Sequence, residues 1–143
     1  MSEDLWTPGR SLHQFAQERP DEAVLICARE DGGEDSLTRA ELDTWSSRLA
    51  HHLLELGLRQ GAFVALVFPT CIEHFVATAA IHKLGGCPMP VNVRMPVAER
   101  NALLELAGPA AIFADAPDLD SISRADMTQL DNYPDTAPPD AIP

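Results

Sequence analysis

The side chains of this chain that could carry out chemistry are five histidines, three cysteines and a single lysine. No two histidines have the His-Glu-x-x-His spacing that places two zinc ligands on one face of a helix. We therefore interpret the histidines as surface or half-buried residues and predict no metal site. They are His13, His51, His52, His74 and His82.

The cysteines Cys27, Cys71 and Cys87 are far apart and form no Cys-x-x-Cys motif. This argues against a zinc site or a disulfide scaffold and favours a reducing cytoplasm. Each lies in or beside an apolar run, so we interpret all three as small core residues rather than nucleophiles. No serine occupies a Gly-x-Ser-x-Gly elbow. The residues alone therefore predict no catalytic group.

Phosphate-binding loops are also missing from the sequence. It contains neither the Gly-x-Gly-x-x-Gly fingerprint nor a Gly-x-x-x-x-Gly-Lys-Ser/Thr loop. The Gly-Gly pairs at 32–33 and 85–86 are interpreted as turns. We predict that the isolated chain binds no cofactor, and that calorimetry with ATP, AMP, FMN or CoA detects no binding, because no phosphate nest is present. This weakens the reading of the chain as a small flavodoxin-type nucleotide-binding domain.

The charge balance excludes one class of partner. The 143 residues carry 22 acidic and 10 basic side chains, a net charge of −12. A surface this acidic repels phosphate backbones, so we expect no nucleic-acid binding. The N-terminus, Met1 to Asp4, lacks the features of a signal peptide, and no apolar run approaches the length of a membrane span. These features favour a cytoplasmic protein without a membrane span.

Local patterns in the first third predict a helix, a hairpin and a long helix. Ser11 is expected to cap a helix through about Arg19, and residues 23–27 form a compact apolar run typical of a strand. After the turn signal at Asp31-Gly32-Gly33, residues 36–38 are expected to pair back on that strand. Thr38 and Glu41 form a capping box for the long helix. Its apolar stripe consists of Leu42, Trp45, Leu49, Leu53 and Leu56.

The middle of the chain predicts strands alternating with helices. Residues 62–68 are apolar at every position, as in a parallel strand covered on both faces. A helix at about 72–84, a strand at 87–91, a helix at 97–107 and a strand at 110–114 follow. Two consecutive crossover units predict an α/β fold with a parallel-type sheet covered by helices. We expect residues 1–10 to be a tail, 11–115 to form this unit, and 116–143 to be a Pro/Asp-rich linker with a helical turn near 121–130.

Several stretches resemble known sequence motifs. Leu37–Leu42 resembles the Leu-Thr-Tyr-x-Glu-Leu core of the adenylate-forming superfamily, and Lys83–Arg94 resembles its second core, Lys-Ala-Gly-Ala-x-Tyr-Val-Pro-Leu-Asn-Pro-Arg. Between them, Leu56–Leu66 resembles Leu-Gly-Val-x-x-Gly-Asp-x-Val-Ala-Leu. Glu73–Phe75 and Pro96–Arg100 match further short patterns in the expected order. The resemblance covers about residues 11–115 and identifies the chain with the N-terminal part of this family.

The resemblance implies a function for the parent protein. Members include acyl-CoA synthetases, luciferases and peptide-synthetase adenylation domains. They activate a carboxylic acid with Mg²⁺ and ATP to an acyl-adenylate, and then usually transfer the acyl group to CoA or another thiol or amine. The family's phosphate loop would follow after the last residue of this chain, so the segment is expected to supply scaffold and to be inactive alone. Its expected partner is the remainder of the same ligase, in cis or as a companion chain.

Within the matched range the sequence departs from the family pattern. Arg39 replaces an aromatic residue of the first core, Pro88 replaces the tyrosine of the second, and Val93 replaces a proline. Lys83 belongs to the second core and is not the family's catalytic lysine. In some CoA-forming relatives an arginine after the second core lies near the CoA nucleotide, which makes Arg94 the candidate for a CoA phosphate contact. The alternative for Arg94 is a surface arginine that bonds a nearby acid or carbonyl.

A second function class fits the same residues. A free-standing α/β segment could act as a non-enzymatic protein-interaction module if it leaves an apolar face or an open sheet edge uncovered. The acyl substrate, the acceptor and the oligomeric state are not encoded in any motif of the chain.

Overall fold

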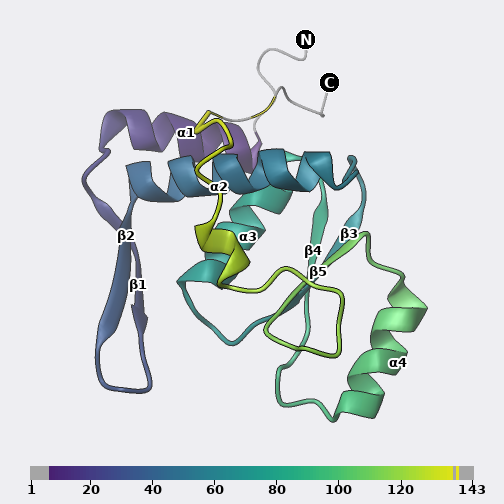
Figure 1. Ribbon diagram of the computed structural model, residues 1–143. Coiled ribbons are helices and arrows are strands. Elements are labelled where there is room, and N and C mark those ends of the chain that lie inside the picture. Colours follow the sequence, from purple (N-terminus) through teal and green to yellow (C-terminus); the bar gives the residue numbers. More distant parts are fainter. Residues whose placement is uncertain (1–6, 137, 139–143) are drawn as a thin grey trace.

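The computed structural model describes residues 7–136 and 138 (Figure 1). Helices and strands alternate along most of this range. Their order is α1 (Pro8–Glu18), β1 (Ala23–Ala28), β2 (Glu34–Thr38), α2 (Arg39–Glu55), β3 (Phe63–Val67), α3 (Ile72–Lys83), β4 (Cys87–Pro90), α4 (Val97–Ala107), β5 (Ala111–Ala114) and the 3₁₀ turn η2 (Asp126–Thr128).

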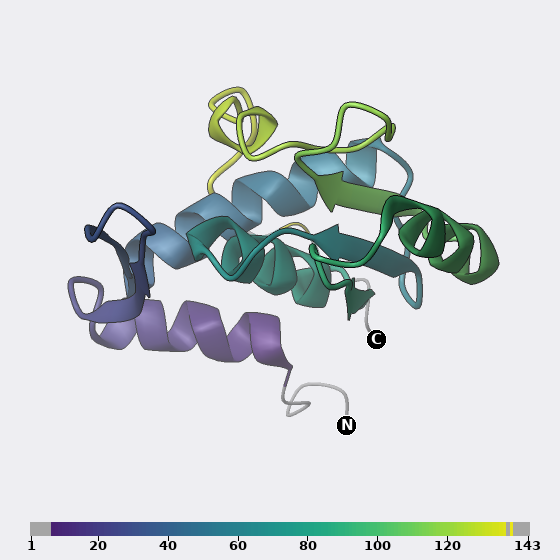
Figure 2. The ribbon, with the colours of Figure 1, turned by 90° about the horizontal axis from the view of Figure 1, so that it is seen from below.

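A three-stranded parallel sheet of order β4-β3-β5 forms the centre of the fold. Residues of β3 alternate between its two faces: Val64 and Leu66 pack in the core formed with α2 and α3, and Ala65 and Val67 pack in a smaller core with Leu104 of α4. Figure 2 shows α2 and α3 on one face of the sheet and α4 on the other. The expected parallel sheet covered by helices is confirmed, and coverage on both faces explains the unbroken apolar run of β3.

The capping box of α2 is also confirmed. The Thr38 hydroxyl accepts a hydrogen bond from the backbone N–H of Glu41 at 3.1 Å, and the Glu41 carboxylate accepts one from the backbone N–H of Thr38 at 3.0 Å. Leu42, Leu49 and Leu53 are buried as the stripe predicts, whereas the side chain of Leu56 is 55% exposed. The prediction that Leu56 faces the core is wrong, because Leu56 is the C-cap residue at which the helix ends.

Thr38→Ala is expected to lower the free energy of unfolding by about 1 kcal/mol, because one N–H at the start of α2 loses its acceptor. Urea denaturation of the chain measures this change. Thr44→Ala, in the interior of the same helix, is the matched control and should change stability much less. Equal effects of the two substitutions would contradict the capping role of Thr38.

The first helix begins earlier than the sequence predicts. Thr7, not Ser11, is the N-cap: its hydroxyl accepts a hydrogen bond from the backbone N–H of Arg10 at 3.2 Å, and Pro8 occupies the first helical position. Proline is favoured there because its missing N–H would have no partner in the helix. Ser11 therefore lies inside α1. Residues 8–10, which were expected to belong to an N-terminal tail, form the first turn of this helix. Residues 1–6 lie outside the described part.

The segment after β5 differs from the expected linker. Ile122 forms a parallel bridge with Phe113, and Ile122, Met127 and Leu130 are buried in the main core. The indole N–H of Trp45 on α2 donates to the Met127 carbonyl at 2.8 Å. Three widely spaced apolar residues thus hold a polar segment on the core, a pattern that composition does not reveal. The helical turn expected near 121–130 is present as η2, and positions 137 and 139–143 lie outside the described residues.

Candidate functional site

The carboxyl ends of β3, β4 and β5 meet at one edge of the sheet because the three strands are parallel. Ligands of open α/β sheets bind outside this edge. The β3–α3 loop and the β4–α4 loop form a pocket of about 260 Å³ here. Its lining residues are Phe68, Pro69, Thr70, His74, Pro90, Val91, Asn92 and Val93. This edge is the candidate site.

Arg94 lies in the β4–α4 loop at this edge. The side-chain oxygen of Asn92 accepts a hydrogen bond from the Arg94 backbone N–H at 2.9 Å, and the Asn92 carbonyl accepts one from Met95 N–H at 3.0 Å. Asn92 therefore shapes the turn that presents Arg94. The side chain of Arg94 is exposed, and its guanidinium has no hydrogen bond or ion pair among residues 7–136 and 138. An exposed guanidinium without a hydrogen-bond partner is available to bind a phosphate or a carboxylate.

His74 lines the pocket from the first turn of α3. Burial lowers its pKa below the ordinary value, so the ring is neutral near pH 7. Its Nδ1 is buried and has no partner among the described residues. The expectation of surface or half-buried histidines holds for His74, which is half-buried. Within the described part of the chain, no three His, Cys, Asp or Glu side chains are grouped to hold a metal ion.

A second pocket lies on the other side of the β3–α3 loop, against the β1–β2 hairpin. Cys71 lines it, and burial raises the pKa of this thiol, which keeps it protonated and poorly nucleophilic near pH 7. Arg124 also lines it and is paired with Asp115, which follows β5. Glu73 lines the same pocket, and its hydrogen bond and charge raise the pKa of the Cys71 thiol further, so this carboxylate does not activate the cysteine as a nucleophile.

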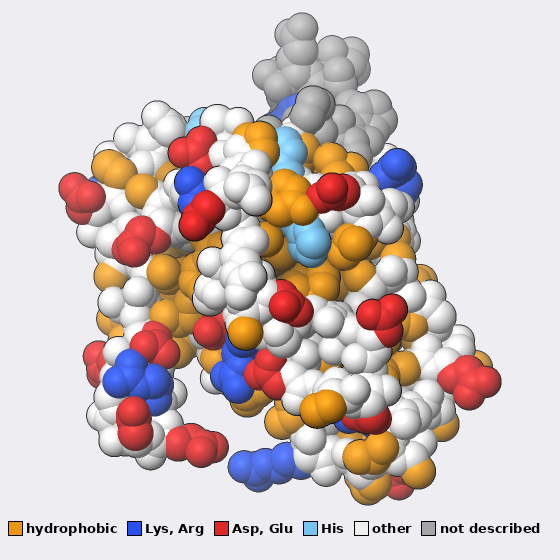
Figure 3. Space-filling model, in the orientation of Figure 1, with side chains coloured by type: hydrophobic (Ala, Val, Ile, Leu, Met, Phe, Trp, Pro, Cys, Tyr) orange, Lys and Arg blue, Asp and Glu red, His pale blue; other side chains and the backbone are white. Residues whose placement is uncertain are grey.

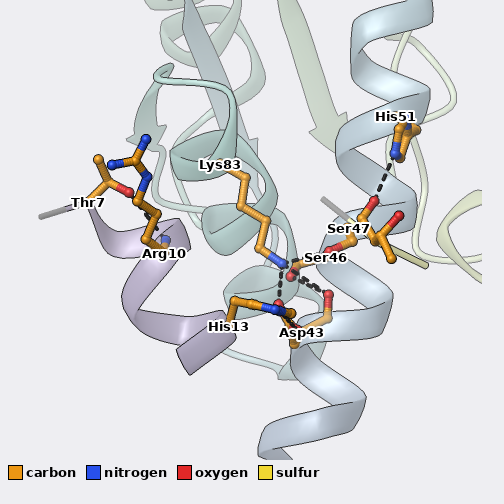
Figure 4. A network of polar contacts seen from close by, with 9 residues as sticks. Thr7, Arg10, His13, Asp43, Ser46, Ser47, His51 and Lys83 are labelled. Carbon is orange, nitrogen blue, oxygen red and sulfur yellow. Dashed lines mark hydrogen bonds and ion pairs between the residues drawn. The ribbon is translucent and has the colours of Figure 1, made fainter. Parts of the chain in front are cut away.

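The strongest polar cluster lies away from this edge, between the helices (Figure 4). Lys83, at the end of α3, is 5% exposed; its ammonium donates to the Asp43 carboxylate at 2.6 Å and to the Ser47 hydroxyl at 2.8 Å. It also donates to the Asp43 carbonyl at 3.0 Å. His13 of α1 bonds the second Asp43 oxygen at 2.9 Å. The cluster thus joins three helices.

Burial lowers the pKa of Lys83, and the Asp43 carboxylate opposes that shift. The lysine has no access to a substrate, because α1 covers it: a Cβ atom added at Gly9 would lie 3.0 Å from Lys83 Cγ. Sequence reasoning placed Lys83 at a helix end but missed Asp43. The sequence signal that could have pointed to Asp43 was a short polar stripe on the buried side of α2, formed by Asp43, Ser46 and Ser47. The position of Lys83 is therefore structural.

Two sheet faces covered by helices and a carboxyl edge lined by loops define an open α/β subdomain. A family model described as AMP-binding enzyme matches residues 12–140. The chain therefore belongs to the family of AMP-binding enzymes. Its fold is that of the N-terminal subdomain of adenylate-forming enzymes, as the sequence resemblance predicts.

Individual relatives agree with this assignment. The chain is 35% identical over 123 residues to nonribosomal peptide synthetase easA of Emericella nidulans, a match over 84% of this chain. Among solved structures, an artificially fused adenylation–carrier di-domain, NpsA-ThdA of Klebsiella oxytoca, matches 95% of the chain with a TM-score of 0.78 and 23% identity. A fatty acyl CoA synthetase of Mycobacterium tuberculosis matches 94% of it with a TM-score of 0.75 and 24% identity.

The chain spans only a small part of these proteins. It corresponds to 2% of the length of easA, 26% of the fused di-domain and 30% of the fatty acyl CoA synthetase. No helix within the described residues is long and apolar enough to cross a membrane.

Proposed function

We propose that this chain is the N-terminal scaffold of a ligase that uses ATP to convert a carboxylic acid to an acyl-adenylate with release of pyrophosphate. A second step transfers the acyl group to CoA or another thiol or amine. The observation that carries this proposal is the family match over residues 12–140, on a fold shared with adenylation and acyl-CoA-forming proteins. The relatives are named as synthetases or synthases, and none supports the alternative of a non-enzymatic interaction module.

In this proposal the chain positions loops and leaves the reaction to the remainder of the ligase, in cis or as a companion chain. The buried ion pair between Lys83 and Asp43 fixes α3 against α2. The first turn of α3 ends the β3–α3 loop, so the placement of this helix also places that end of the loop at the carboxyl edge. When bound, ATP would supply the adenylyl group, and Mg²⁺ would neutralise charge that develops on its phosphates. A cytoplasmic location, where ATP is available, fits the same proposal.

The activity is tested by ATP–pyrophosphate exchange with a panel of fatty, aromatic and amino acids. We expect the isolated 143-residue chain to be inactive and the longer ligase that contains it to be active with one acid class. Acyl-AMP formation by the isolated chain would contradict the scaffold role. An inactive ligase across the whole panel would contradict the assignment to carboxylate activation.

Arg94 is proposed to contact a CoA phosphate. The guanidinium is exposed at the carboxyl edge and has no partner among the described residues, so its donors fit an incoming phosphate. In a ligase with a CoA acceptor, Arg94→Ala is expected to raise the KM for CoA about tenfold, the loss of roughly 1.4 kcal/mol. The kcat should change little, because the contact is the same in ground and transition states.

Arg59→Ala is the matched control for Arg94→Ala. Arg59 precedes β3 and lies at the end of the sheet where the parallel strands begin. Its guanidinium donates a hydrogen bond to the Leu58 carbonyl at 2.8 Å. Its substitution should leave the KM for CoA unchanged. If the two substitutions have equal effects on the KM for CoA, or if Arg94→Ala has none, then Arg94 is a surface arginine that does not contact CoA.

A further inference from the structure

A pocket of about 490 Å³ lies between α2 and the segment that follows β5. This volume is typical of small-molecule sites. The pocket shares no lining residue with the two pockets at the carboxyl edge. In Figure 3, hydrophobic side chains are visible in a recess between the β1–β2 hairpin and the segment that carries η2. The proposed function assigns no role to this face of the molecule.

The apolar walls of this pocket belong to the main core. Met127 and Leu130 line it and are only 1% and 5% exposed. Trp45 of α2 lines it as well, and its indole N–H donates to the Met127 carbonyl at 2.8 Å. Leu37 of β2 is also buried and contributes to the lining. The packing and the hydrogen bond hold the two walls in place, so the pocket is formed before any ligand binds.

Arg48 of α2 is the basic residue of this pocket. Its Nε is buried and has no hydrogen-bond partner among the described residues. Within residues 7–136 and 138, the ion pair of its guanidinium is with Asp131 at 3.5 Å, and the Asp131 side chain is 93% exposed. An ion pair of this kind is weak in water. A buried N–H without an acceptor costs free energy, so Arg48 retains donors for an incoming acceptor.

The position of charges along α2 defines the ligand that would fit. The planar guanidinium of Arg48 matches the two oxygens of a carboxylate, and the apolar walls require an apolar body. Glu41 also lines the pocket, and it precedes Arg48 by seven residues, which is about 10 Å along a helix. A second anionic group at that end would be repelled. A monocarboxylate fits better than a dicarboxylate.

We propose that this pocket binds a monocarboxylate with an apolar chain. The carboxylate takes the place of Asp131 on the Arg48 guanidinium, and the chain extends between α2 and residues 127–131 toward Glu41. The bound ligand thereby bridges α2 and the segment after β5. This inference goes beyond the proposed function and does not depend on it, because every group of the site belongs to this chain.

Titration with octanoate tests the site in the Trp6→Phe variant, in which Trp45 is the sole tryptophan of the chain. We expect a saturable change in the fluorescence of Trp45. Arg48→Gln should raise the Kd about tenfold by removing the charge, and Arg48→Lys should restore only part of the affinity. Asp131→Asn should lower the Kd about threefold, because it removes the carboxylate that competes for Arg48. A purely structural role of Arg48 predicts no such gain.

Arg59→Gln is the matched control for Arg48→Gln. The Arg59 guanidinium bonds the Leu58 carbonyl, and neither residue lines this pocket, so the Kd for octanoate should stay unchanged. Octanol supplies the apolar chain without the charge, and inorganic phosphate supplies an anion without the chain. Each should bind at least about tenfold more weakly than octanoate. Circular dichroism of each variant checks that the fold is retained.

Four outcomes would overturn the inference. The first is the absence of a saturable change with octanoate, and the second is an octanol or phosphate affinity equal to that of octanoate. The third is an equal loss of affinity in folded Arg48→Gln and Arg59→Gln variants. The fourth is binding to the isolated chain that is lost in the longer ligase, which would assign the pocket to a contact with the remainder of that protein.

Discussion

Lys83→Met is expected to lower the free energy of unfolding by about 3–5 kcal/mol, because it leaves the Asp43 carboxylate buried without its cation. Asp43 is 8% exposed, and the ion pair to Lys83 spans only 2.6 Å. Methionine keeps most of the volume of the lysine side chain, so the lost stability measures the unpaired charge and not a cavity. Urea denaturation followed by circular dichroism measures the change.

The double variant Lys83→Met/Asp43→Leu separates this charge effect from packing. Replacing both partners with apolar residues removes the unpaired charge, so we expect the double variant to recover most of the lost stability. His13→Ala should cost much less than Lys83→Met, because His13 is 57% exposed and contacts Asp43 from the solvent side. A Lys83→Met variant as stable as the parent chain would show that the cluster contributes nothing to folding.

Phe113→Ala is expected to cost about 3–5 kcal/mol of stability, since it removes a large side chain from a closed core. Phe113 is fully buried in β5 and meets the ring of Phe68 edge-on, with ring centroids 6.0 Å apart. It also carries the bridge to Ile122, so the segment over 119–130 should loosen with it. Thermal unfolding and exchange at the Met127 amide measure the two effects.

Phe63→Ala is the matched control for Phe113→Ala. Phe63 begins β3, and its side chain is 51% exposed. Its loss should cost about 1 kcal/mol or less, because little apolar area leaves the core. Comparable losses at the two positions would mean that the core around Phe113 collapses to fill the space.

Local sequence signals were sufficient where a single element carries the information. The capping box at Thr38 and Glu41 and the unbroken apolar run of β3 each predicted an element that the structure contains. The expected start of α1 at Ser11 was wrong, because Thr7 and Pro8 form an equally local signal that acts four residues earlier. Phe75, which shares the apolar character of α3, is 37% exposed. Hydrophobicity predicts that a helix has a buried face but does not assign every residue to it.

The candidate site was only partly predictable. Arg94 was singled out through the family resemblance, and the structure places it at the carboxyl edge with a turn shaped by Asn92. A CoA contact at Arg94 stays a prediction. The histidines are expected as a group to be surface or half-buried, and His74 is half-buried; its position in the pocket depends on where α3 begins relative to the β4–α4 loop. Pocket walls come from separate loops, and no local pattern specifies how loops from different strands meet.

The sequence by itself determined the order of elements, the two crossover units and the family, because hydrophobic period, caps and turn residues are local. Only the tertiary structure decided which distant groups meet. Lys83 donates to Asp43 across 40 positions of sequence, and Met127 accepts a hydrogen bond from Trp45 across 82. These contacts depend on the relative placement of packed elements. That placement is set by burial summed over the whole core and not by any one segment.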